Sequence, residues 1–212
     1  MIPVVADIFV GSQVVSAFVG VRKYRTLDKS MKVLAILLIL ACIQTGLELA
    51  WALRSKTNYF LSDYFRIVEV SLLCIVFVTS SRLKGNRRSL IVLGCVFAVV
   101  WAANLIFFDD TNRMNSLMGM VSRAFMMAMA ALVLWSQLRD ERLPMTEQPL
   151  FWVASGVILY AVSTIAILGL SNTLIQLGRP YFYVAWHINW IMSIVANIFY
   201  VKGMLCSVPV PK

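Results

Sequence analysis

The chain has 212 residues, of which 60% are hydrophobic and only 14% charged, with a mean hydropathy of +0.82. Ordinary globular chains hold ~45–50% apolar and ~25% charged residues. These values exclude a soluble enzyme, a disordered chain and a secreted disulfide-stabilised domain. The net charge of +9 does not indicate nucleic-acid binding, because basic residues accumulate in the cytoplasmic loops of membrane proteins.

Seven mostly apolar stretches are each long enough to cross a bilayer core of ~30 Å, which takes about 20 residues. In chain order they cover residues 2–21, 31–53, 59–80, 89–108, 115–138, 149–170 and 181–206. The connections between them are short. The sequence therefore predicts an all-α fold with a single domain, residues 1–212, built as a bundle of seven transmembrane helices.

The basic residues predict how this bundle lies in the membrane. Thirteen of the 19 Lys and Arg residues fall in or beside the first, third and fifth connections and at the C-terminal end, whereas four fall in the opposite connections. Basic residues mark the cytoplasmic side. We therefore expect a multi-pass protein of the inner membrane with its N-terminus outside and its C-terminus in the cytoplasm.

A few ionisable or strongly polar side chains interrupt the apolar stretches. Such residues are costly in lipid and usually face the interior of a bundle, so each is a functional candidate. With the expected orientation, they all lie in the outer half of their helices. The residues are Asp7, Glu48, Arg66, Glu69, Asn104, Arg123 and His187.

Helical periodicity predicts which faces of two helices carry polar groups. On the last helix the polar stripe consists of Tyr183, His187, Trp190, Ser193, Ile194 and Asn197, and Asn189 is the one polar residue outside it. On the second helix the stripe consists of Gln44, Thr45, Glu48 and Trp51.

The polar layer allows three interpretations. It can be a structural network, in which Arg66 pairs with Glu69 three residues away and Arg123 pairs with Glu48 or Asp7. It can be a ligand pocket, or part of an ion or proton path. For the pocket, the predicted ligand-binding residues are Glu48, Arg66, Glu69, Asn104, Arg123, Tyr183, His187 and Trp190, with Asp7, Gln44 and Asn197 as further candidates.

Several membrane chemistries lack the residues they need. The four cysteines form no C-x-x-C pair, and the chain has one histidine, whereas zinc enzymes need several clustered ligands. Ser155 and His187 lie in opposite halves of the expected bundle, which argues against a serine protease. Lys202 lies at the cytoplasmic end of its helix, where it cannot hold retinal. No enzyme activity, metal or cofactor is therefore expected.

The last third of the chain resembles a known family. Phe151-Trp152 is followed by Ser155-Gly156 and Tyr160, and Trp186-His187 is followed by Asn197-Ile198 and Tyr200. This arrangement is similar to that of small, largely uncharacterised bacterial seven-helix membrane proteins related to membrane sensor domains. The resemblance implies a sensor function.

From these observations we expect a receptor or sensor-like protein that binds a small polar or zwitterionic ligand in an outward-facing pocket. Arginine suits such a ligand because it can hold a carboxylate bidentately. The alternatives are a transporter or channel for a small solute or protons, and a structural membrane subunit. The expected partners are the lipid bilayer, an unidentified small ligand, and a cytoplasmic signalling protein or a second copy of the chain.

Overall fold

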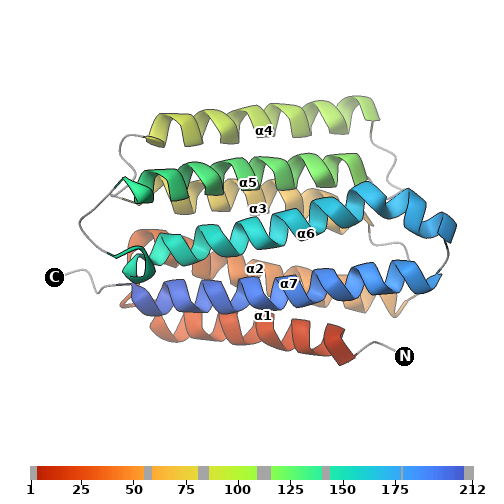
Figure 1. Cartoon of the computed structure of the whole chain (residues 1–212), viewed down its shortest axis with the longest axis horizontal. Coiled ribbons are helices and arrows are strands. Elements are labelled where there is room, and N and C mark those ends of the chain that lie inside the picture. The colour runs from red at the N-terminus through yellow and green to blue at the C-terminus, as the bar shows by residue number, and fades with distance from the viewer. Residues whose placement is uncertain are drawn as a thin grey trace.

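The computed structural model describes residues 4–54, 59–80, 86–108, 116–139, 144–177 and 179–207. The described part is all-α, as predicted, and consists of seven long helices and one short 3-10 helix (Figure 1). In chain order these are α1 (Val4–Lys23), α2 (Lys29–Ala52), α3 (Tyr59–Val78), α4 (Arg87–Phe108), α5 (Ser116–Leu138), η2 (Met145–Glu147), α6 (Pro149–Leu177) and α7 (Arg179–Cys206).

Most helix ends agree with the prediction to within two residues, and local signals account for them. Asp28 is the N-cap of α2, where its carboxylate accepts a hydrogen bond of 2.8 Å from the Met31 amide. Pro149 opens α6, where a missing amide hydrogen costs nothing. The exception is the end of α6, which was expected at residue 170 and lies at Leu177. Residues 171–177 are more polar but contain no Gly or Pro, so the helix continues beyond its apolar part.

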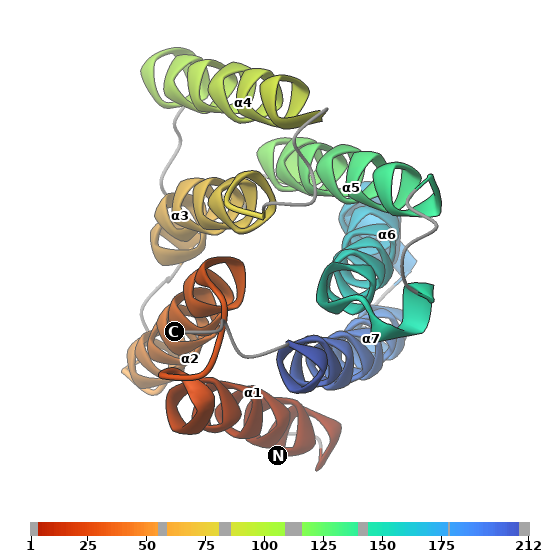
Figure 2. The ribbon, with the colours of Figure 1, turned by 90° about the vertical axis from the view of Figure 1, so that its left-hand side faces the viewer.

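Six of the seven long helices form a closed ring. Neighbouring helices pack in the order α1, α2, α3, α5, α6, α7 and back to α1. Figure 2, which looks along the bundle, shows this ring. The ring matters for function because every one of its helices presents a face to a common interior.

Helix α4 lies outside the ring and packs against α3 and α5 (Figure 2). Its outer surface is apolar and exposed, with Val99 69% and Phe107 73% accessible. Although α4 follows α3 and precedes α5 in the chain, it does not lie between them in space. Helices α3 and α5 contact each other directly.

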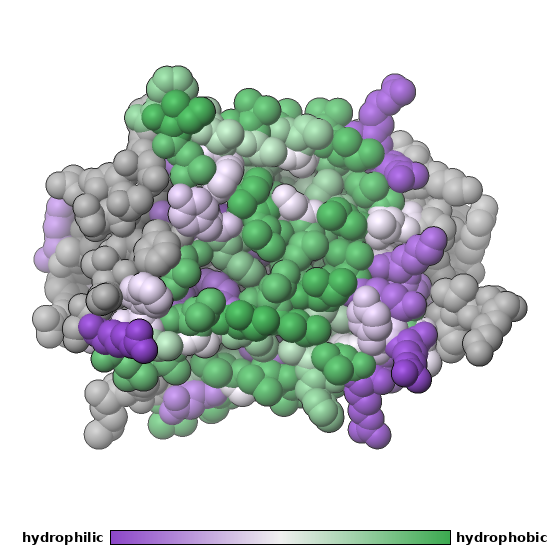
Figure 3. All heavy atoms as spheres, turned by 180° about the vertical axis from the view of Figure 1, so that it is seen from behind, coloured by the Kyte–Doolittle hydropathy of each residue, from purple (hydrophilic) through white to green (hydrophobic). Residues whose placement is uncertain are grey.

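The outer surface of the bundle is typical of a multi-pass membrane protein. Among the described residues, six helices are long and apolar enough to cross a membrane, namely α1, α2, α4, α5, α6 and α7. Figure 3 shows a band of hydrophobic side chains between more polar ends. In water such a surface would cause aggregation, whereas in lipid it is the expected surface. The remaining helix, α3, carries three charged residues, Asp63, Arg66 and Glu69.

The interior of the ring differs between its two ends. We call the end at which α1, α3, α5 and α7 finish the core end, and the opposite end the pocket end. Nearly all the most buried apolar side chains lie toward the core end, where α2, α4 and α6 begin. They include Met31, Leu34, Phe77, Leu90, Met129, Val133, Val153 and Met204. The buried arginines Arg66 and Arg123 lie nearer the pocket end, whereas the buried polar residues at the core end are uncharged, namely Ser30, Gln137 and Gln148.

Candidate functional site

A cavity of about 300 Å³ lies inside the helix ring. All six ring helices contribute to its wall, from Phe9 on α1 to Tyr200 on α7. Leu34, Leu38 and Leu73 close it toward the core end. The cavity therefore has ionisable, amide and hydroxyl groups in a largely apolar wall, above an apolar floor.

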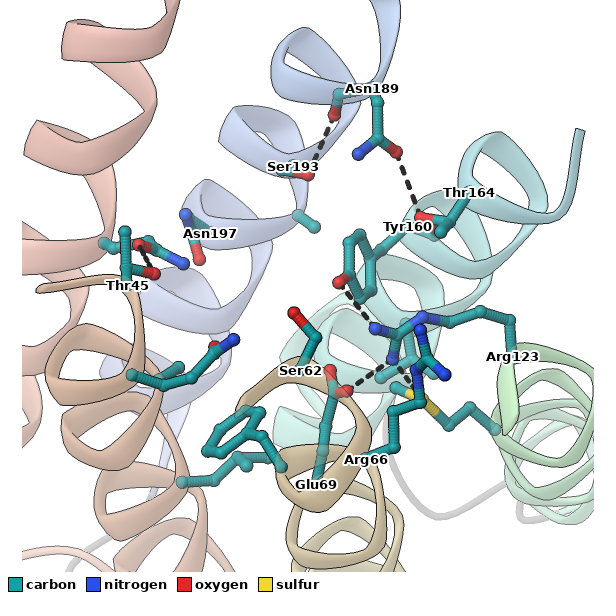
Figure 4. Close-up of a pocket in the computed structure, with 18 of the residues that line it drawn as sticks. Thr45, Ser62, Arg66, Glu69, Arg123, Tyr160, Thr164, Asn189, Ser193 and Asn197 are labelled. Atoms are coloured by element: carbon teal, nitrogen blue, oxygen red, sulfur yellow. Dashed lines mark hydrogen bonds and ion pairs between the residues drawn. The ribbon is translucent and has the colours of Figure 1, made fainter. Parts of the chain in front are cut away.

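Arg123 on α5 is bonded to side chains of two other ring helices (Figure 4). Its Nη1 donates to Glu69 Oε2 on α3 at 2.5 Å, and its Nη2 donates to the Tyr160 hydroxyl on α6 at 2.9 Å. The guanidinium carbon also lies 4.5 Å from the centre of the Tyr160 ring, in a cation–π contact. Arg123 thus joins three helices of the ring although it is only 8% exposed.

One donor of Arg123 is not used in this way. Its Nε is buried and makes no hydrogen bond with any residue that the structure describes. A buried donor without a partner costs free energy. The unbonded Nε therefore offsets part of the stabilisation that the other contacts of Arg123 provide.

Arg66 on α3 lies beside this group. It forms an ion pair with Asp63 on the same helix. Gly119 on α5 makes room for it, because a Cβ atom at residue 119 would lie 3.3 Å from Arg66 Nη2 and 2.7 Å from Leu168 Cδ1. Arg66 and Arg123 thus enter the cavity from neighbouring helices with a carboxylate bonded to each.

Glu48 on α2 is the second carboxylate of the cavity wall. It accepts hydrogen bonds from Gln44 Nε2, one turn earlier on α2, and from Ser62 Oγ on α3 at 2.5 Å. Nearby, the Thr45 hydroxyl bonds the Gln13 side chain of α1 at 3.0 Å. These contacts hold the polar faces of α1, α2 and α3 together around the cavity.

Two asparagines of α7 form hydrogen bonds with the neighbouring helices α6 and α1 at the cavity wall. Asn189 forms hydrogen bonds with the Thr164 and Ser163 hydroxyls of α6, at 3.0 and 3.3 Å. Asn197 donates to Ser12 Oγ on α1 at 2.9 Å. Both asparagines are buried. The ring is therefore held together around the cavity by hydrogen bonds as well as by apolar packing.

The structure brings most of the predicted site residues together. The ones that line the cavity are Gln44, Glu48, Arg66, Glu69, Arg123, Trp190 and Asn197. The ion pairs differ from those expected. Glu69, expected to pair with Arg66, accepts from Arg123, and Arg123 pairs with neither Glu48 nor Asp7 in the described contacts.

Four predicted residues are not in the described lining of the cavity. Asn104 lies on α4, outside the ring, and Asp7 is exposed near the start of α1. Tyr183 is 52% exposed, and the His187 ring bonds the Tyr183 carbonyl at 2.6 Å and packs edge-on against Trp190. The cavity face of α7 is rotated by about 60° from the predicted stripe, at 3.6 residues per turn.

Several cavity residues were not among the predicted site residues. The polar and aromatic ones are Phe9, Gln13, Thr45, Ser62, Phe65, Tyr160, Thr164, Trp186, Asn189, Ser193 and Tyr200. Tyr160 and Tyr200 belong to the sequence motifs on which the family resemblance rests. Those motifs could therefore have indicated both tyrosines as site residues. On α7, Trp186 and Asn189 lie outside the predicted stripe and line the cavity together with Ser193, which belongs to the stripe.

The described residues contain no group of three or more His, Cys, Asp or Glu side chains that could hold a metal ion. The described lining of the cavity offers groups for hydrogen bonding, ion pairing and aromatic contact. No family model, curated protein or solved structure matches the chain. The function must accordingly be inferred from the geometry of the site.

Proposed function

We propose that the protein is a receptor or sensor-like protein of a bacterial inner membrane, which binds a small polar or zwitterionic solute inside its helix ring. The observation that carries this proposal is the cavity of about 300 Å³ with ionised, amide and hydroxyl groups in its wall. Burying such groups costs free energy unless they are fully bonded. A bundle with a purely mechanical role would be better served by apolar packing at the same positions.

The proposal takes the pocket end as the outer side of the membrane. Basic residues gather at the core end, among them Arg22, Lys23, Arg87, Arg88 and Arg139, and such residues concentrate on the cytoplasmic side. All seven long helices then span the membrane, the N-terminus lies outside and the C-terminus lies in the cytoplasm. The basic surface would be available to anionic lipid or to a cytoplasmic signalling partner.

The inclusion of α3 among the spans is supported by where its charges face. The side chains of Asp63, Arg66 and Glu69 are only 16%, 10% and 13% exposed. Charged side chains inside a membrane characteristically face the bundle and pair with one another. A helix of 20 residues is also long enough to cross a bilayer core.

Filling the cavity is expected to abolish solute binding. Ala41 on α2 lines the cavity, so Ala41→Phe would occupy space that a solute needs. The measurement is the melting temperature of the purified protein with and without glycine, choline, acetate or glycerol. A probe that binds the folded state raises its stability by about 2.7 kcal/mol at 100 times Kd.

The matched control is Ala124→Phe, which adds the same volume at an exposed position on α5. We expect at least one probe to stabilise the native chain and the Ala124→Phe variant, but not Ala41→Phe. Equal stabilisation of both variants, or none of the native chain, contradicts the proposal.

A transporter is the second candidate, and the length of the cavity favours it. Its lining extends along α7 from Trp186 to Tyr200, about 21 Å at the rise of an α-helix. A transporter predicts proton or solute flux into liposomes that Glu69→Gln abolishes, because Glu69 lies farther from the pocket end of its helix than the other carboxylate of α3. The receptor proposal predicts no flux with either the native chain or the variant.

A further inference from the structure

The connection between α1 and α2, at the core end, is strongly basic. Its cationic residues, counted from the last turn of α1 to the first turn of α2, are Arg22, Lys23, Arg25, Lys29 and Lys32. The one carboxylate of this stretch, Asp28, is engaged as the N-cap of α2. None of these cations forms an ion pair with a residue that the structure describes. The positive charge of the connection is therefore not neutralised by the described part of the protein.

This basic connection is anchored to the bundle. Leu27, in its middle, is buried in the apolar core. The Ser30 hydroxyl, in the first turn of α2, donates to the Val76 carbonyl of α3 at 2.6 Å. Arg25 and Lys29 are exposed on either side of these anchors. Because the backbone that carries the cations is already ordered, little further ordering is needed for several of them to act on one anion.

The surface of α1 beside these cations is apolar. Phe18 and Val21 are each more than half exposed. Phe18 precedes Arg22 by four residues, so the two side chains lie on the same side of the helix. Tyr24 follows at the end of α1, where Lys32 Nζ lies 5.8 Å from the centre of its ring, and tyrosine rings favour the level of the lipid head groups. A cationic surface thus continues directly into an exposed apolar one.

We propose that the α1–α2 connection binds an anionic phospholipid, with the phosphate of the head group at Arg22, Arg25 and Lys29 and the acyl chains along Phe18 and Val21. Clusters of about four to eight basic residues beside a transmembrane helix attract anionic lipids. A soluble anion would contact the cations alone, whereas a phospholipid also covers the exposed apolar side of α1. This site is separate from the cavity, and it does not require the cavity to bind a solute.

The test follows the melting temperature of the full-length protein in a neutral detergent as dioctanoyl phosphatidylglycerol is added at constant ionic strength. The comparison probes are dioctanoyl phosphatidylcholine, inorganic phosphate and a hexaglutamate peptide. Phosphatidylglycerol is expected to stabilise the protein at lower concentration than each of these. The double variant Arg25→Gln with Lys29→Gln should raise the phosphatidylglycerol concentration at half-maximal shift by about tenfold or more, because two of the attracting charges are lost.

The matched control is the double variant Arg87→Gln with Arg88→Gln. It removes the same charge from exposed positions at the core end, but on α4, which lies on the opposite side of the bundle from α1 (Figure 2). It should leave the half-maximal concentration nearly unchanged. Phe18→Ala should raise that concentration several-fold, because apolar contact with the acyl chains is lost, whereas Phe107→Ala, at an exposed position on α4, should not. The melting temperature of each variant without lipid verifies its folding.

Equal stabilisation by phosphatidylglycerol and phosphatidylcholine overturns the inference, and so does an equal loss of phosphatidylglycerol binding in the two double variants. Stabilisation by phosphate or hexaglutamate that matches that by phosphatidylglycerol identifies a soluble anion as the occupant and overturns it as well. These results leave the proposed function untouched, because the cavity is tested with other probes and with Ala41→Phe.

Discussion

Replacing Arg123 with leucine is expected to lower the free energy of unfolding by about 3–5 kcal/mol, the usual cost of removing one partner of a buried ion pair. The guanidinium is 8% exposed and bonds both Glu69 on α3 and Tyr160 on α6. Its loss leaves the Glu69 carboxylate buried without this cation and disconnects three helices. Chemical denaturation in detergent micelles gives the measurement.

The matched control is Arg139→Leu, at the exposed end of α5, where the guanidinium lies over the Trp135 ring at 4.8 Å. Exposed contacts of charged groups contribute about 1 kcal/mol or less. The double variant Arg123→Leu with Glu69→Leu should recover much of the loss, because neither charge of this ion pair is then left buried without the other. Equal destabilisation by Arg123→Leu and Arg139→Leu would refute the bridging role.

A maleimide that cannot cross membranes is expected to label a cysteine at residue 53 in intact spheroplasts, and to leave a cysteine at residue 26 unlabelled. Leu53 follows α2 at the pocket end and is 77% exposed, and Thr26 follows α1 at the core end and is exposed. Nearly all of the label should be on the cysteine at residue 53 and almost none on that at residue 26, because the reagent cannot cross the bilayer to the cytoplasmic side.

The experiment uses a background in which the native cysteines, Cys42, Cys74, Cys95 and Cys206, are replaced by alanine. After permeabilisation both introduced cysteines should react, which verifies that each is accessible. Labelling of Thr26→Cys alone in intact spheroplasts would reverse the proposed orientation. The pocket would then open to the cytoplasm.

The helices could be predicted from the sequence because hydrophobic length is a local property. Each of the seven apolar stretches corresponds to one long helix of the described structure. Hydrophobic length does not predict the end of a helix that continues beyond its apolar stretch. Residues 171–177 are such a case, because they are more polar than the preceding residues and still continue α6. Where a helix extends beyond its apolar part, its end depends on helix-breaking residues such as Gly and Pro rather than on hydrophobicity.

The candidate site could be predicted only in part, because helix neighbours are not a local property. Glu69 and Arg123 lie 54 residues apart, and their contact requires α3 and α5 to be adjacent. Chain order suggests that α4 lies between them. Asn104 was expected at the site because strongly polar residues in membrane helices usually face the bundle interior, whereas α4 lies outside the ring.

The face of α7 was misplaced for a related reason. The predicted stripe, derived from helical periodicity, had Tyr183 and Trp190 near its centre and ended on one side at His187. Its ring contacts Tyr183 and Trp190 on its own helix, so its polarity is satisfied without the cavity. Asn189, set aside as an exception, is the buried residue that bonds α6. Trp190, Ser193 and Asn197 of the predicted stripe do line the cavity, but four of the seven lining residues of α7 lie outside the stripe.

The position of α4 outside the ring also provides a convenient site for spectroscopic reporters. Cys95 on α4 is exposed, and α4 contributes no side chain to the described lining of the cavity. A nitroxide or a lipophilic dye attached there would sit among lipid chains, leave the cavity untouched, and sense any shift of α3 relative to α5. The native chain thus already carries a labelling position from which movement of the ring can be followed.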